Sequence, residues 1–255
     1  MSSDQPRWTE VEHLPEWDEE FYHIYTARKF GKWVMMKTLR PEFADDPRYM
    51  SMIEQEFDVR YNLAHPNIVM INDFEDVPGV GRCIVTDDVY GDSLRKLIDE
   101  KRVTPAHIEQ LRHQLVDALD YIQSKHIVHP PLTPDNIIFT EGMGNLKLID
   151  VGYEQRPSLS FQSTSDDIYN YGRVLDTALK ASGTTDPILR RVVRRCTDPD
   201  PKKRFRDMQQ VHLALEGRKS TVINTIIIVF LVLMFLLAIW LMSPYRPLPP
   251  DAVAQ

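Results

Sequence analysis

The first third of the chain alternates apolar and polar residues with the two-residue period of half-buried β-strands. Residues 21–40 predict two strands that turn at Gly31, because glycine tolerates the backbone conformations of tight turns. Shorter strands are expected at residues 68–74 and 82–87, on either side of a turn at Pro78 and Gly79. The pattern therefore predicts a small lobe made mainly of strands.

A three- and four-residue spacing of apolar positions interrupts the strands and predicts one helix in this lobe. Pro47 marks the start of the helix, because proline is favoured in a first turn. The apolar positions are Met52, Ile53, Phe57 and Tyr61.

From Thr104 onward the pattern is mainly helical. Thr104 is a candidate N-cap and Pro105 suits the first turn of a long core helix. One face of this helix carries Ile108, Leu111, Leu115, Leu119 and Ile122. A loop and a hairpin are expected at residues 126–150, and further helices from about residue 166, at 187–196 and at 206–216. This part of the chain predicts a second, helical lobe.

Residues 221–242 form an apolar run with no charged residue. About 20 apolar helical residues cross ~30 Å of hydrocarbon, so the run predicts one transmembrane helix rather than a buried core helix. Arg218 and Lys219 precede it, which predicts that the folded domain lies on the cytoplasmic side. We expect a single-pass protein of a bacterial inner membrane.

The formal net charge of −7 hides a basic segment at residues 190–219. Because this segment ends at the apolar run, we expect it to face anionic lipid headgroups rather than nucleic acid, although a solvated face is an equal alternative. The expected membrane-facing residues are Arg190, Arg191, Arg194, Arg195, Arg218 and Lys219. The two cysteines, Cys83 and Cys196, fit a reducing compartment and have no metal-binding spacing.

Several strings, in order, resemble the protein kinase family, in particular bacterial Ser/Thr kinases with a transmembrane helix. V-M-M-K ends at Lys37, and Glu56 precedes H-P-N-I-V by nine residues, like the family's lysine and its glutamate partner. H-P-P-L-T-P-D-N ends at Asn136 and resembles the catalytic loop, and D-V-G begins at Asp150 and resembles D-F-G. Asp167 and Arg204 resemble two structural residues of the family.

The resemblance implies an α+β, two-lobed kinase-like fold with a reduced activation segment and a reduced large lobe, followed by the transmembrane helix. The expected divisions are an N-terminal segment at 1–20 that contains a degenerate phosphate loop, a kinase-like domain at 21–216 with lobes at about 21–90 and 91–216, a basic linker at 217–220, the span at 221–242 and a Pro-rich tail at 243–255.

The catalytic loop departs from the family pattern at three positions. Pro131 stands where the resemblance implies an aspartate that accepts the substrate proton, and proline has no titratable group. Pro130 replaces the preceding arginine, and Thr133 replaces a lysine that would meet the charge on the transferred phosphoryl group.

The nucleotide side departs as well. Residues 17–22, W-D-E-E-F-Y, stand where a glycine-rich loop would approach the phosphates, and their bulk and negative charge oppose that approach. Met35 shares a strand face with Lys37 and stands where the family has an alanine above adenine.

Further departures concern the active conformation and substrate docking. Arg60 occupies an apolar position of the family's internal spine, and only sixteen residues separate Asp150 from Asp167. Thr164, Ser165 or another hydroxyl in an expected loop at 158–165 is a weak candidate for phosphorylation.

Lys37, Glu56, Asn136 and Asp150 survive, as a residual nucleotide site or as a buried polar network that joins the lobes. We expect no cofactor, ATP and Mg²⁺ at most weakly bound, and no metal unless Asp150 and Asn136 hold Mg²⁺. The sequence predicts a pseudokinase that is not an enzyme and that recruits or regulates an unknown protein partner at the membrane. The alternative is an unorthodox nucleotide-dependent transferase or a weakly ATP-binding regulatory homologue.

Overall fold

The computed structural model describes residues 6–141, 144–152 and 154–242, and the side chains of 217–224 and 241–242 lie outside the description. The chain divides into two compact units, Met1–His212 and Leu213–Gln255. Three features that the sequence singled out lie outside the description. They are the side chains of Arg218 and Lys219, the other side chains of the linker 217–220 and the tail 243–255.

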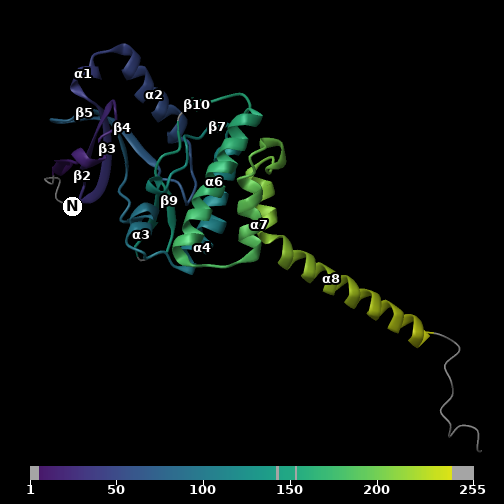
Figure 1. Cartoon of the computed structure of the whole chain (residues 1–255). Helices are drawn as coiled ribbons and strands as arrows, with labels where there is room; N and C mark the ends of the chain where they lie inside the picture. Colours follow the sequence, from purple (N-terminus) through teal and green to yellow (C-terminus); the bar gives the residue numbers. More distant parts are fainter. Residues whose placement is uncertain (1–5, 142–143, 153, 243–255) are drawn as a thin grey trace, which may run out of the picture. The chain divides into compact units, whose positions relative to one another are not determined.

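The small lobe is a five-stranded antiparallel sheet with strand order β1-β2-β3-β5-β4 (Figure 1). The strands are β1 Trp8–His13, β2 Tyr22–Lys29, β3 Lys32–Leu39, β4 Ile71–Val77 and β5 Gly81–Asp87. Phe30 and Gly31 form the two-residue turn between β2 and β3, both with positive φ, as expected for hairpin turns that match strand twist. The sequence reasoning did not predict β1.

Two helices follow β3. They are α1 Pro41–Ala44 and α2 Pro47–Tyr61. The predicted start of α2 at Pro47 is confirmed, and the Asp46 side chain caps it by accepting a hydrogen bond from the Arg48 amide. Ile53 of α2 packs with residues of β2 and β3 in one apolar cluster. This packing fixes α2 against the sheet and brings its buried polar residues toward β3.

The large lobe begins with a short strand and helices. They are β6 Gly91–Ser93, α3 Leu94–Asp99, α4 Pro105–Gln110, a π-helical segment at Leu111–Leu115 and α5 Val116–Ser124. Thr104 caps α4 as predicted, and its hydroxyl and the His107 side chain form a reciprocal capping box. The predicted apolar face is buried throughout, so the continuous stretch from α4 to α5 is the core helix of this lobe.

Short strands and a 3-10 turn form the loop region after α5. They are β7 Ile127–Val128, a 3-10 turn at Pro134–Asn136, β8 Ile137–Thr140, β9 Leu146–Leu148 and β10 Glu154–Gln155. One small sheet has the order β6-β8-β9, and β10 pairs with β7. The predicted hairpin is therefore confirmed as β8 and β9, and the turn before β8 places the catalytic-loop residues next to the start of the D-V-G string.

Two further helices complete the large lobe, namely α6 Phe161–Ser182 and α7 Pro187–Cys196, followed by a 3-10 turn at Pro201–Lys203 (Figure 1). The prediction that α6 begins near residue 166 and follows an exposed loop at 158–165 is wrong. Ser160 caps the helix by accepting from the Ser163 amide, so Thr164 and Ser165 lie in its first turns, and Ser165 is buried.

The exposed face of α7 carries Arg190, Arg191, Arg194 and Arg195, whereas its opposite face is buried. Arg204 is different, as expected for a structural residue. Its guanidinium donates to the Asp198 and Ser165 carbonyls and stacks over the Tyr169 ring.

The last helix is α8 Met208–Met242. Its apolar side chains between Ile226 and Trp240 are exposed. Among the residues that the structure describes, however, we find no helix that combines the length and apolar character needed to cross a membrane. The predicted transmembrane helix at 221–242 is therefore not confirmed.

Candidate functional site

A cavity of about 310 Å³ lies where residues 19–22, β3, α2 and the D-V-G string meet. It brings together two of the surviving acidic residues and the lysine that the sequence singled out. The lining residues are Glu19, Glu20, Phe21, Tyr22, Lys37, Met52, Glu56, Pro130, Asp150 and Gly152.

Lys37 projects from β3 and is held by three groups. Its Nζ lies 2.9 Å from Glu19 Oε2, 3.2 Å from Glu56 Oε2 and 4.1 Å from the centre of the Tyr22 ring. Burial alone would disfavour the ammonium, but the Glu56 and Glu19 carboxylates outweigh it and raise the pKa of Lys37. Lys37 is therefore charged and already paired.

Glu56 is shared between Lys37 and Arg60. Its Oε1 lies 2.6 Å from Arg60 Nη1, and both side chains are buried. Burial works against the carboxylate, yet Lys37 and Arg60 lower the pKa of Glu56 on balance. Arg60 Nη2 also donates to the Ile149 carbonyl, so this network joins α2 to the large lobe just before Asp150. Of the four residues that the sequence predicted as one buried network, Lys37 and Glu56 pair with each other and Arg60 joins them, whereas Asp150 is exposed and its carboxylate bonds within the D-V-G string.

The catalytic-loop region lies against the same cavity. Pro130 lines it, Pro131 is exposed, and the Ile149 amide donates to the Asn136 carbonyl at 3.0 Å. This backbone bond sets Asn136 beside the residue that precedes Asp150. The Asp150 carboxylate is exposed at the cavity and accepts from the Gly152 amide at 3.4 Å.

Gly152 is required at its position by backbone geometry. Its φ of +79° lies in the left-handed region, and a Cβ there would come within 2.5 Å of the Val128 carbonyl oxygen. The D-V-G string thus turns sharply after Asp150, with Val151 fully buried. The turn leaves the Asp150 side chain at the cavity.

The segment between β1 and β2 contains residues that the family resemblance places at a phosphate loop. A 3-10 turn at Pro15–Trp17 occupies part of it, followed by two acidic residues with different partners. Asp18 accepts from the Ile24 amide and contacts two histidines, whereas Glu19 reaches Lys37. The segment is therefore closed over the lysine instead of open to phosphate oxygens.

The cavity is lined by a lysine and by several carboxylates, so its charges can be compared with those that a cation and a phosphate group need. A carboxylate suits Mg²⁺, so Asp150, which lines the cavity, fits the ion that the sequence considered, whereas Asn136 is not among the lining residues. Lys37 supplies the positive charge for phosphate oxygens, and Glu56 orients it. The residues present therefore fit a nucleotide with magnesium.

A two-lobed fold in which a strand lysine, a helix glutamate and a D-V-G aspartate surround one cavity is that of a protein-kinase-like protein. The chain belongs to the protein kinase domain family, whose model matches residues 21–166. The crystal structure of the Mycobacterium tuberculosis PknI kinase domain superposes with a TM-score of 0.61 at 20% identity, over 85% of this chain and 99% of that one. This similarity shows the fold alone.

Curated relatives carry kinase names. Serine/threonine-protein kinase 36 of Pongo abelii is 31% identical over 54% of this chain, and PknG of Mycolicibacterium smegmatis is 30% identical over 75% of it. PknD of Mycobacterium tuberculosis is 28% identical over 60% of this chain. The matches span 10%, 30% and 23% of these relatives' own lengths.

The prediction that the chain is not an enzyme is wrong, because the family match and the serine/threonine kinase names of its relatives point to an enzyme. The prediction gave too much importance to Pro131. Phosphoryl transfer depends mainly on positioning and electrostatic stabilisation, so loss of the loop carboxylate lowers the rate without removing the rest of the site. Lys37, Glu56 and Asp150 remain around one cavity.

Sequence reasoning missed two features of this site. Glu19 was recognised as an acidic obstacle but not as the partner of Lys37. Arg60 was read as a defect in an apolar position, whereas it pairs with Glu56. The four-residue spacing of Glu56 and Arg60 on one helix was a signal for the second contact.

Proposed function

We propose that the chain is a slow, nucleotide-dependent phosphotransferase of the kinase family whose own phosphate loop regulates the cleft. The observation that carries this proposal is the position of Lys37 Nζ, 2.9 Å from Glu19 and 3.2 Å from Glu56 at a cavity that Asp150 also lines. The cleft keeps the groups for nucleotide but holds the lysine in an internal ion pair.

Each surviving residue of the cavity has a defined task in this proposal. When Glu19 swings outward, Lys37 binds phosphate oxygens while Glu56 holds its ammonium in place. Asp150 holds magnesium, which when bound neutralises the phosphate charge. Without a carboxylate at Pro131, proton transfer lacks help that is typically worth ~10²–10⁴-fold in rate. The expected activity is therefore slow.

Weak nucleotide binding follows from the same residues. Glu19 must be displaced, Glu20 adds negative charge at the cavity, and Met35 stands partly buried on the face of Lys37. ATP with Mg²⁺ is thus the proposed ligand, at low affinity. We propose no nucleic-acid ligand.

Regulation through a protein partner is part of the proposal. Because α6 begins at Phe161, little chain remains after Asp150 to form a peptide-docking platform, so a partner contact elsewhere would select the substrate. The partner is an unidentified protein.

We also propose attachment to the inner face of a membrane through residues 221–242 and the arginines of α7. The apolar sequence of that run and the exposure of the arginines support this proposal.

Transfer of labelled phosphate from ATP tests the proposal. The purified protein should label itself or a general protein substrate slowly, and Glu19→Gln should increase the rate. Lys37→Ala and Asp150→Asn should each abolish the labelling. Glu16→Gln is the matched control, because Glu16 is an exposed acid of the same loop outside the cavity. Labelling that persists in both Lys37→Ala and Asp150→Asn, or its absence in Glu19→Gln, would contradict the proposal.

A further inference from the structure

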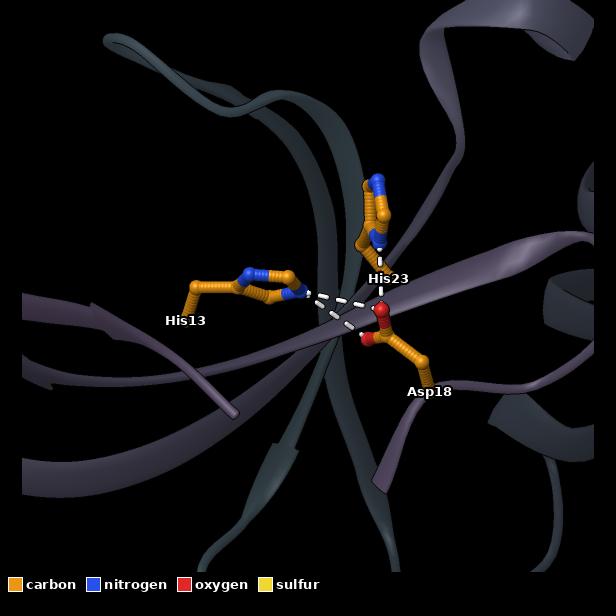
Figure 2. A group of neighbouring side chains, drawn as sticks. All are labelled: His13, Asp18 and His23. Atoms are coloured by element: carbon orange, nitrogen blue, oxygen red, sulfur yellow. Dashed lines mark hydrogen bonds and ion pairs between the residues drawn. The ribbon is translucent and has the colours of Figure 1, made fainter. Parts of the chain in front are cut away.

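Three polar side chains, from the end of β1, the segment after it and the start of β2, lie close together (Figure 2), and none of them lines the cavity. His13 Nε2 lies 3.0 and 3.1 Å from the two carboxylate oxygens of Asp18, and His23 Nδ1 lies 2.7 Å from one of them. The two imidazole rings meet edge to face, with centroids 4.6 Å apart. All three side chains are partly buried.

The local fold gathers these residues from separate elements. His13 ends β1 and stands opposite Tyr25 in the ladder with β2, while His23 lies near the start of β2. The 3-10 turn between the strands returns the chain so that Asp18 Oδ1 accepts from the Ile24 amide at 3.0 Å. The Leu14 amide donates to the Ile24 carbonyl at 2.8 Å, and this bond holds the two ends of the segment between β1 and β2 together. The three ligand groups are therefore held by backbone structure.

The Asp18 carboxylate lies between the two imidazole nitrogens, and the Ile24 amide holds one of its oxygens in place. A carboxylate and two imidazoles form a donor set that divalent zinc binds.

We propose that His13 Nε2, Asp18 and His23 Nδ1 bind one Zn²⁺ ion. The three ligand atoms lie within 4.8 Å of one another. A tetrahedral zinc with bonds of about 2.0–2.2 Å holds its ligand atoms roughly 3.3 Å apart, so only a small adjustment is needed. Each histidine then coordinates through the nitrogen that now donates to Asp18, and its other ring nitrogen carries the proton. Water completes the fourth position.

The ion would also act on the cleft, because the residue after Asp18 is Glu19. Ile24 pairs with Lys37 across β2 and β3, and strand alternation sends His23 to the opposite face. Asp18 is therefore held on the histidine face while Glu19 reaches Lys37 on the other. Zinc bound to Asp18 fixes the segment between β1 and β2 in the conformation in which Glu19 pairs with Lys37. Because Lys37 is then occupied, bound zinc opposes nucleotide binding. This coupling, unlike zinc binding itself, rests on the proposed function.

Calorimetric titration of the metal-free chain with Zn²⁺ tests the site, with Co²⁺ and its visible absorption as a second probe of tetrahedral coordination. Wild type should bind one ion per chain. His13→Gln and His23→Gln should each weaken binding by more than about 10–100-fold, the loss that removal of a residue behind a metal ligand already causes. His113→Gln is the matched control, because His113 is a partly buried histidine of another element, also beside a carboxylate, that of Glu109. Undiminished binding in the His13→Gln, His23→Gln double variant, or none in wild type, would overturn the site and leave a hydrogen-bonded cluster only.

Circular dichroism of each variant checks that it folds. If the double variant unfolds, long-range ¹H–¹⁵N spectra of the wild-type histidines decide. Two of the eight imidazoles should shift at one equivalent of Zn²⁺, with Nε2 and Nδ1 as the coordinating atoms. A uniform shift, or none, would overturn the site.

The coupling has its own readout. Saturating Zn²⁺ should weaken binding of ATP with Mg²⁺ about 3–10-fold in wild type and leave it unchanged in the double variant. Zinc binding with unchanged ATP affinity would overturn the coupling alone. Absence of ATP binding under all conditions would contradict the proposed function and overturn the coupling with it, while the zinc titration still decides the site.

Discussion

Asp167 gives a stability prediction whose sign follows from burial. It lies 7% exposed in α6, and one oxygen accepts from Gln123 Nε2 at 3.0 Å. Burial, together with neighbouring Asp166, raises the pKa of Asp167 from 3.8 to about 7 in spite of the Gln123 hydrogen bond. Between about pH 4 and pH 7, the Asp167 carboxyl is therefore mostly neutral in the folded protein and mostly ionised in the unfolded chain.

The sign of the effect is opposite to that of a carboxylate in an ion pair. Stability from Asp167 is greatest below pH 3.8 and falls as the pH rises toward 7, because only the unfolded state loses its proton in that window. A shift of this size corresponds to an upper limit of about 4 kcal/mol, since one pKa unit is worth ~1.4 kcal/mol. Asp167→Asn removes the penalty but leaves an amide group to satisfy, at a cost of ~1–3 kcal/mol.

Urea unfolding followed by fluorescence at several pH values measures the difference between variants. Asp167→Asn should gain about 2–4 kcal/mol relative to wild type between about pH 4 and pH 8. Asp176→Asn is the control, because Asp176 is a partly exposed residue of the same helix that pairs with Lys180, and this variant should show no such trend. A difference between Asp167→Asn and wild type that stays constant with pH, or that falls as the pH rises, would refute the reasoning.

Three further predictions follow from the burial or exposure of polar and charged side chains. Glu56→Ala should cost ~3–5 kcal/mol in urea unfolding, because it leaves Lys37 and Arg60 without their shared partner. Glu54→Ala on the same helix removes only a partly exposed partner of Arg82 and should cost less than ~1 kcal/mol, so equal losses would contradict the network. Ser165, 1% exposed and bonded to Arg204, should carry no phosphate by mass spectrometry after treatment of the folded protein with an active kinase. A chain that ends at Gly217 should bind anionic liposomes and dissociate from them in high salt, and equal binding to neutral liposomes would contradict this. Charge reversal of the α7 arginines, Arg190, Arg191, Arg194 and Arg195, should abolish the binding to anionic liposomes.

Strong local signals made most elements predictable. Pro47 after Asp46 and Thr104 before Pro105 are capping patterns that act within one turn, and both helices begin there. The kinase resemblance predicted the two-lobed fold. Strand β1 was missed because its edge position leaves many residues exposed, so it lacks a clear apolar face. The start of α6 was placed too late because polar residues of its first turns resemble a loop.

Long-range contacts of the site were the less predictable part. Lys37 and Glu56 were recognised from the family pattern, but the Glu19 contact joins residues on a loop and a strand that no local period connects. The histidine cluster depends on a loop that returns Asp18 between two strands, one of which was not predicted. In both cases tertiary geometry determines which of several nearby charges meet.

Calorimetric affinity for ATP with Mg²⁺ tests the central claim, that Glu19 closes a working nucleotide cleft by pairing with Lys37. The Glu19 side chain is 52% exposed, so the pair is worth up to ~1 kcal/mol, and Glu19→Gln should bind about fivefold more tightly than wild type. Glu16→Gln should match wild type, and Lys37→Ala should lose binding. No gain in Glu19→Gln, or full binding retained in Lys37→Ala, would contradict the account.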